Sequence, residues 1–187
     1  DGSVTVLKDG IPVAADEIFD AARLSRAKLG DFVEAELQRA AKDGVMVSLH
    51  LKATMMKVSD PILFGAVVAT YFKKAFEKHA AALASVDANP NNGLKSVLDA
   101  VKSLPNAAEI AADFAACYEQ PDRPKVAMVD SDKGITNLHV PSDVIIDASM
   151  PAMIREGGKM WNVEGNTQDA VAVIPDRSYA GVYQATI

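Results

Sequence analysis

Residues 45–61 constrain the fold of this chain more than any other segment. The run 45–51 alternates two sets of side chains, which predicts a short buried strand. One set faces one side of the strand: Val45, Val47, Leu49 and Leu51. The other set faces the opposite side: Met46, Ser48, His50 and Lys52. Asp60-Pro61 then starts a helix. Lys52 therefore leaves the end of a strand, where open α/β folds place their chemistry.

Hydrophobic spacing along the rest of the chain predicts alternating helices and short strands. Helices are expected over 16–24, from the N-cap Ser25 to Gly44, and over 61–83, 94–104, 107–118, 144–155 and 176–186. Strands are expected over 4–7, 45–51 and 126–129, with a hairpin of 160–163 and 170–174. The pattern predicts an α/β fold with layered helices on a short mixed sheet, formed by residues 1–187 as a single domain or subdomain.

Composition narrows the function classes for these 187 residues. The net charge of −6 argues against a nucleic-acid partner, which would need clustered positive charge. No apolar run of about 18 residues predicts a membrane span, and no signal peptide is visible at the start. The single cysteine, Cys117, has no internal disulfide partner, so a cytoplasmic setting is expected. Its apolar neighbours predict a buried structural thiol.

Two aspartates form the candidate cation site. Asp143 and Asp147 are four residues apart on a predicted helix, so their carboxylates share one face. Mg²⁺ and Mn²⁺ prefer such oxygen ligands, although two carboxylates one turn apart are also common on solvated helices. Pro151 removes the hydrogen bond to the carbonyl of Asp147, so a kink is expected there.

The histidines and Lys57 carry weaker signals. His50 is expected to be a hydrogen-bonded core residue, and Lys57 a solvated surface residue. His79 and His139 have no metal-ligand spacing with each other or with Cys117, so zinc is not predicted.

Several strings resemble the monomeric type of NADP-dependent isocitrate dehydrogenase. They are residues 48–61, 91–94, 131–155, 158–161 and 172–177. The resemblance covers roughly residues 45 to 183, and residues 1 to 44 follow it more loosely. It implies an isocitrate/isopropylmalate dehydrogenase-like fold. Because that family's chain is several times longer, these residues correspond to an internal segment of the enzyme.

The resemblance also implies residue roles. Lys52 corresponds to the catalytic lysine that binds isocitrate and helps to deprotonate its hydroxyl group, and Asp147 to a ligand of Mg²⁺ or Mn²⁺. Asp143 is then expected to cap the helix. The implied activity, a step of the tricarboxylic acid cycle, is the oxidative decarboxylation of isocitrate to 2-oxoglutarate. The resemblance also implies that NADP is bound mainly by residues outside this segment, and no G-x-G-x-x-G motif is present here.

Two readings of the chain stay open at this point. In the first, it supplies a catalytic lysine and one metal-ligand aspartate to a longer isocitrate dehydrogenase. In the second, it is a non-catalytic α/β fragment that folds and self-associates without turnover. The isolated chain is expected to be inactive under either reading. A different metal-dependent hydroxy-acid dehydrogenase is disfavoured, because the matched strings are too specific to one family.

Overall fold

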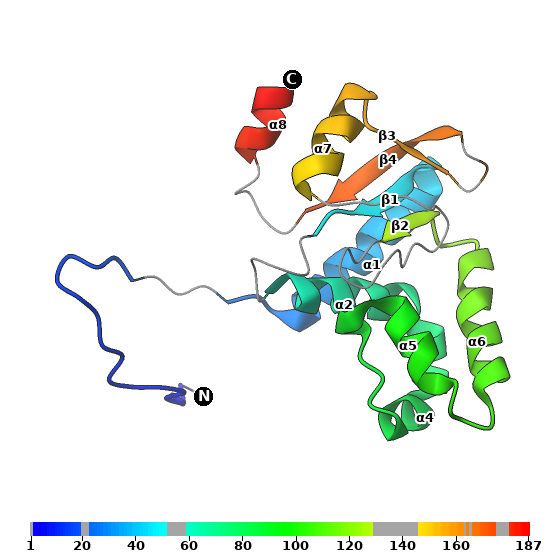
Figure 1. Ribbon diagram of the computed structural model, residues 1–187, viewed down its shortest axis with the longest axis horizontal. Coiled ribbons are helices and arrows are strands. Elements are labelled where there is room, and N and C mark those ends of the chain that lie inside the picture. The colour runs from blue at the N-terminus through cyan, green and yellow to red at the C-terminus, as the bar shows by residue number, and fades with distance from the viewer. Residues whose placement is uncertain are drawn as a thin grey trace.

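Figure 1 shows that an N-terminal arm, residues 2–19, extends away from the body formed by the rest of the chain. This computed structural model describes residues 2–19, 23–51, 59–128, 146–162, 164, 166–174 and 180–187. Within these ranges, the side chains of residues 128, 146–149, 180 and 182 are not described.

A four-stranded mixed sheet lies at the centre of the body, with the strand order β2-β1-β4-β3. The strands are β1 (Met46–Leu49), β2 (Val126–Met128), β3 (Lys159–Trp161) and β4 (Thr167–Val173). β1 pairs in parallel with β2 and with β4, and Ser48 lies opposite both Ala127 and Ala172. β3 and β4 form the expected antiparallel hairpin. The predicted α/β class and mixed sheet are confirmed.

Both faces of β1 are buried, and the predicted alternation of its side chains is confirmed. Val47, Leu49 and Leu51 belong to a large core that also contains residues of α1 to α6. Met46 belongs to a second core with Met150, Met153 and Met160. In Figure 1, the helices α7 (Ile146–Arg155) and α8 (Ala180–Thr186) lie above the sheet, whereas α2, α5 and α6 lie below it. A strand that is covered on both faces has a nearly continuous apolar sequence, and residues 45–51 come close to this pattern.

Helix α1 (Arg26–Asp43) begins and ends where the sequence predicts. The Ser25 hydroxyl accepts a hydrogen bond from the Lys28 N–H at 3.4 Å, which satisfies one free donor of the first turn. Gly44 follows the helix with a φ of 69°, the left-handed conformation that glycine adopts without steric cost.

The single helix predicted over 61–83 is wrong, because the chain forms three helices there. They are α2 (Ser59–Tyr71), α3 (Lys73–Lys78) and α4 (Ala80–Ser85). At Phe72 and His79 the ψ angles are 24° and 20°, so the helical run is interrupted twice. The Phe72 ring is buried at the first interruption, and its centroid lies 5.5 Å from that of Phe114 and 5.4 Å from that of Tyr118. Apolar spacing alone does not reveal such breaks, because each piece keeps its own buried side.

The layer below the sheet continues through short helices. η1 (Pro90–Asn92) leads into α5 (Gly93–Val101), and α6 (Ala107–Ala116) leads into the 3₁₀ turn η2 (Cys117–Glu119). The helices predicted over 94–104 and 107–118 are therefore confirmed apart from their ends. Above the sheet, Pro151 lies inside α7 as expected, and the kink at Asp147 stays a prediction. Residues 143–145 and 175–179 lie outside the described part, so the predicted starts of α7 and α8 are not tested.

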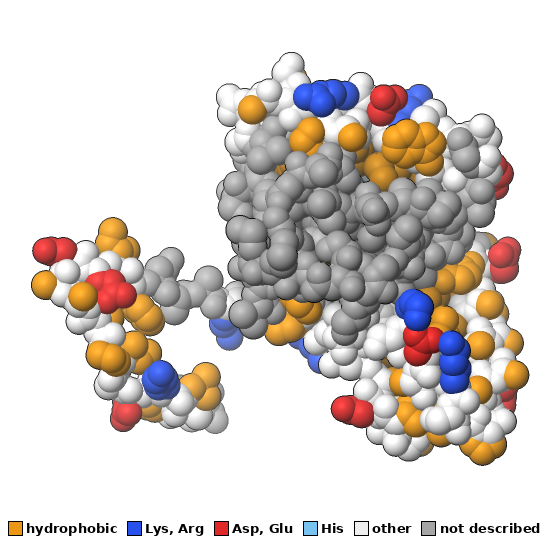
Figure 2. All heavy atoms as spheres, viewed as in Figure 1, with side chains coloured by type: hydrophobic (Ala, Val, Ile, Leu, Met, Phe, Trp, Pro, Cys, Tyr) orange, Lys and Arg blue, Asp and Glu red, His pale blue; other side chains and the backbone are white. Residues whose placement is uncertain are grey.

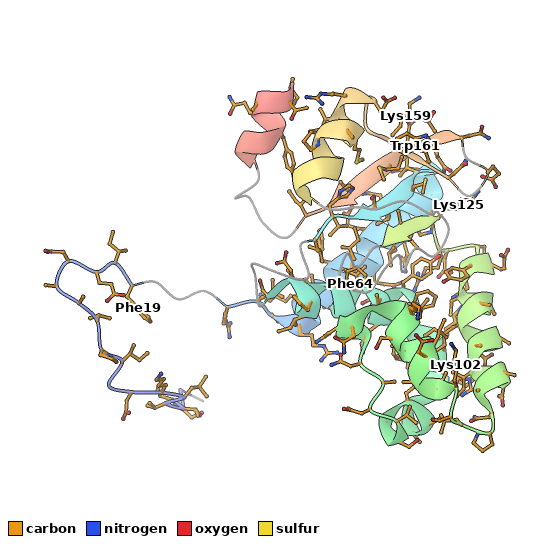
Figure 3. The ribbon with its side chains drawn as sticks, in the orientation of Figure 1. Phe19, Phe64, Lys102, Lys125, Lys159 and Trp161 are labelled. Carbon is orange, nitrogen blue, oxygen red and sulfur yellow. The ribbon has the colours of Figure 1, made fainter. Side chains whose placement is uncertain are left out.

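The elements predicted in the N-terminal arm do not form. No strand occurs in the described residues 2–19, and the described parts of the predicted helix over 16–24 are not helical. Figure 3 shows the Phe19 side chain on the arm, away from the body, and Phe64 within it. Short helices and single strands need packing partners in order to be stable, and the arm lies against none in this structure.

Gly65 is the point at which α2 meets η1 most closely. A Cβ atom at this position would overlap the Asn91 side chain and would lie 2.8 Å from the Asn91 backbone nitrogen. We expect Gly65→Ala to lower the free energy of unfolding by about 1–3 kcal/mol, the usual cost of overpacking. Urea denaturation measures the change. The matched control is Gly30→Ala in α1, where a Cβ atom meets nothing within 4 Å and should add about 0.5–1 kcal/mol of stability. Equal effects at the two glycines would contradict the packing argument.

Candidate active-site edge of the sheet

The carboxyl ends of the three parallel strands lie at one edge of the sheet. β1, β2 and β4 run in the same direction, so Leu49, Met128 and Val173 end side by side. Figure 1 shows the first turn of α7 beside the arrowhead of β4, at this same edge. Parallel α/β sheets bind their ligands at such edges, so we treat this one as the candidate site.

Of the two predicted site residues, the structure describes the backbone of Asp147 but not Lys52. Lys52 follows the buried Leu51 in the sequence but lies outside the described residues, as do Lys57 and Asp143. The backbone of Asp147 lies in the first turn of α7. Met150 and Met153 of the same helix pack with Met46 of β1, which fixes α7 on the sheet. The structure therefore supports the placement of the Asp147 backbone near the candidate edge, while the relation of its carboxylate to Lys52 stays a prediction.

His50 is the buried polar residue at the end of β1. It is 0% exposed, and its Nε2 lies 2.8 Å from the Ser48 hydroxyl. Its backbone N–H donates to the carbonyl of Val173 at 2.9 Å, which extends the pairing with β4. Burial lowers the pKa of His50 from its usual 6.5 to about 4, so the imidazole is neutral at physiological pH. The prediction of a hydrogen-bonded core histidine is confirmed.

Asp60 is a buried residue that the sequence argument missed. It was expected only to start a helix, yet it is 0% exposed in the first turn of α2, where its Oδ1 accepts from the Ser59 hydroxyl at 3.4 Å. The positive end of the helix dipole favours a carboxylate there. An aspartate before a proline and an apolar run predicts the start of a helix, but nothing local in the sequence predicts that the Asp60 carboxylate is buried.

The metal ion and the NADP cofactor that the sequence resemblance implies would need different binding groups at this edge of the sheet. Mg²⁺ and Mn²⁺ need oxygen ligands, and Asp147 of α7 is a carboxylate in the right part of the fold. Neutral, buried His50 offers a nitrogen and suits these hard cations less well. For NADP, the sequence contains no glycine-rich phosphate loop of the G-x-G-x-x-G type.

Cys117 is 2% exposed, and its thiol donates to the carbonyl of Asp113 at 3.4 Å. Burial raises the pKa of the thiol, which disfavours the reactive thiolate. The prediction of a structural cysteine is confirmed.

The depressed pKa of His50 predicts a stability change with pH. An unfolded chain binds a proton at His50 near pH 6.5, whereas the folded chain binds it only near pH 4. Stability contributed by the neutral ring is therefore complete above pH 6.5 and is lost as the pH falls towards 4, by at most about 3 kcal/mol. Urea denaturation between pH 4 and 7 measures the slope. In the control His50→Gln, this part of the slope should be absent; an unchanged slope would mean that another group titrates.

Comparison with known proteins identifies the family. None of the helices formed by the described residues combines the length and apolar character that a membrane span requires. The family model of monomeric isocitrate dehydrogenase matches residues 1–187. The chain is 56% identical to the isocitrate dehydrogenase (NADP) of Azotobacter vinelandii, 52% to that of Corynebacterium efficiens and 46% to isocitrate dehydrogenase (NADP) 2 of Mycobacterium tuberculosis. Each match covers 100% of this chain and 25% of the relative, so the chain spans about a quarter of their length. The chain belongs to the monomeric isocitrate dehydrogenase family.

Proposed function

We propose that this chain is one part of an NADP-dependent isocitrate dehydrogenase that converts isocitrate to 2-oxoglutarate by oxidative decarboxylation. The observation that carries the proposal is the 56% identity, over the whole chain, to a relative that bears this name. The segment would act as one subdomain of the catalytic domain, and a cytoplasmic setting stays a prediction. Because the chain spans 25% of that relative, the activity is proposed for the longer protein.

The proposed roles follow from the chemistry of the reaction. Lys52, which follows Leu51 in the sequence, would take the proton of the isocitrate hydroxyl as hydride passes to NADP. A lysine can do so when its surroundings lower its pKa. Asp147 would bind Mg²⁺ or Mn²⁺, which polarises the hydroxyl and carboxylate oxygens of the substrate. The position of α7 at this edge supports the second role.

The alternative reading concerns the chain in isolation. Its N-terminal arm carries large apolar side chains into solvent: Val4 is 86% exposed, and Leu7 and Ile18 are each 95% exposed. Figure 2 shows these apolar groups along the arm. Exposed apolar surface of this kind favours association, so we propose that the isolated chain self-associates.

Lys52→Met in the full-length protein should lower kcat by about 100-fold or more, because it removes the general acid–base group. Steady-state production of NADPH from isocitrate measures the effect. Lys57→Met is the matched control, since it removes a lysine five residues away that has no assigned role. Near-normal turnover of the Lys52 variant would refute the assignment.

Asp147→Asn in the full-length protein should raise the concentration of Mn²⁺ needed for half-maximal activity by about tenfold or more, because an amide is a weaker cation ligand than a carboxylate. Asp143→Asn is the control. It should leave the metal requirement unchanged and cost at most about 1 kcal/mol through the helix cap. If both variants show the wild-type metal dependence, another residue holds the ion.

The isolated 187-residue chain should form dimers or larger species and should produce no NADPH from isocitrate. Light scattering at several concentrations, paired with the activity assay, tests both statements. Replacement of Val4, Leu7 and Ile18 by serine should reduce the association if the arm causes it. A chain that stays monomeric would refute the association, and robust turnover would refute the dependence on the rest of the protein.

A further inference from the structure

A second polar group lies on the other side of the sheet from α7, where the α3–α4 junction meets α6. His79 occupies the junction, and Glu109 and Asp113 lie one turn apart on α6. The His79 Nε2 is 2.6 Å from the Asp113 Oδ2. One ligand atom from each of the three residues falls within a span of 4.8 Å. His79 is 30 or more positions from Glu109 and Asp113 in the sequence, so only the folded chain brings it to them.

The His79 ring is held firmly. The residue is 6% exposed, its backbone N–H donates to the Ala75 carbonyl at 3.0 Å, and its carbonyl accepts from the Leu83 N–H at 2.9 Å. α3 and α6 are also joined beside it, because the Phe76 and Phe114 rings pack edge to face at 5.1 Å. A ligand fixed in this way loses little freedom on binding.

Lys78 shows that the group already attracts a cation. Its ammonium lies 2.6 Å from the Asp113 Oδ2 and 3.2 Å from the Glu109 Oε1. The hydrogen bond from Lys78, and then that from His79, holds the pKa of Asp113 below its usual value. The Lys78 side chain is 53% exposed, so it can turn into solvent. Its departure would leave two carboxylates and one imidazole, a set whose charge of about −2 a divalent cation neutralises.

We propose that His79, Glu109 and Asp113 form a binding site for a divalent transition-metal ion of the Zn²⁺ type, which exchanges with the Lys78 ammonium. One nitrogen and two oxygen ligands, with water in the fourth position, suit Zn²⁺ and disfavour Mg²⁺. Bonds of about 2.0–2.2 Å place the ligand atoms of a tetrahedral site about 3.3 Å apart, so small rotations of the two carboxylates suffice once the proton that the His79 Nε2 shares with Asp113 has passed to solvent or to Nδ1. The site is separate from the proposed Asp147 site and needs nothing from it.

The expected consequence is a link between two elements of the lower helical layer. A bound ion would join the α3–α4 junction to α6, and any ligand that binds only the folded state raises its stability. The spacing argument that compared His79 with His139 and Cys117 missed the group because it left out carboxylate partners. Glu109 and Asp113 alone would be two acidic residues on a helix surface. The buried His79 imidazole adds the third ligand that makes the group a candidate metal site.

Zn²⁺ titration by calorimetry tests the proposal in the full-length protein, with Mg²⁺ in excess to occupy hard-cation sites. His79→Gln, which keeps a polar group beside Asp113, should weaken Zn²⁺ binding about 10- to 100-fold. Lys78→Met should strengthen it about three- to tenfold, because it removes the competing ammonium and its two exposed ion pairs. Lys102→Met is the matched control: its ammonium lies 2.6 Å from the Asp99 Oδ1, with no histidine in that group. Figure 3 shows Lys102 on the lower part of the body.

Opposite effects of the His79 and Lys78 variants, with no effect of Lys102→Met, are the expected result. Circular dichroism checks that His79→Gln is folded. If it is not, Lys78→Met still tests the proposal, because Lys78 is exposed and its replacement leaves the core intact. Equal Zn²⁺ affinity and stoichiometry in the wild type and in Lys78→Met would overturn the exchange. Tighter binding in the Lys102 variant to the same degree would mean that Zn²⁺ responds only to net charge, and would also overturn the site.

Discussion

The burial of β1 on both faces is the constraint on which the rest of the structure depends. Met46 and Val47 point to opposite sides, yet they are 0% and 3% exposed. Each face therefore needs its own cover, which α1 to α6 provide on one side and α7 and α8 on the other. A slip of one residue in the register would send Ser48 and His50 into the aromatic core around Phe64 and Phe72. In that core the two polar side chains would lose their hydrogen bonds, and this energetic cost disfavours the slipped register.

The placement of Ser48 and His50 connects this constraint to function. Two polar residues in a buried strand cost stability unless they are bonded, and here they bond to each other at 2.8 Å. The neutral state of His50 removes the larger cost of a buried charge. The strand thus approaches the candidate edge with a polar but uncharged face.

The sequence predicted the elements whose signals are local. The Ser25 cap, the Gly44 end of α1, the alternation along β1 and the β3–β4 hairpin each depend on residues within a few positions of one another. The predictions were wrong where contacts between residues distant in the sequence determine the structure. The breaks at Phe72 and His79 lie where these residues contact Phe114 and Asp113, which are more than 30 residues away, and among the described residues the large apolar side chains of the arm stay exposed. For the candidate site, the sequence predicted the edge and His50, but burial of Asp60 and the His79 group needed the folded chain.

The two proposed cation sites belong to helices on opposite faces of one sheet, and that separation has a physical consequence. The proposed Asp147 ligand belongs to α7, above the sheet, whereas His79, Glu109 and Asp113 border the large core below it. A metal ion in the lower group would stabilise the helical layer that supports β1 without contact to the reacting atoms. Lys78 already links the same two elements more weakly, because its ammonium, at the end of α3, contacts both Glu109 and Asp113 of α6. An exposed ion pair of that kind is worth about 0–1 kcal/mol, so exchange of the ammonium for a dication costs little. An ion in the proposed lower site would therefore make the lower helical layer more rigid without contact with the proposed Asp147 site.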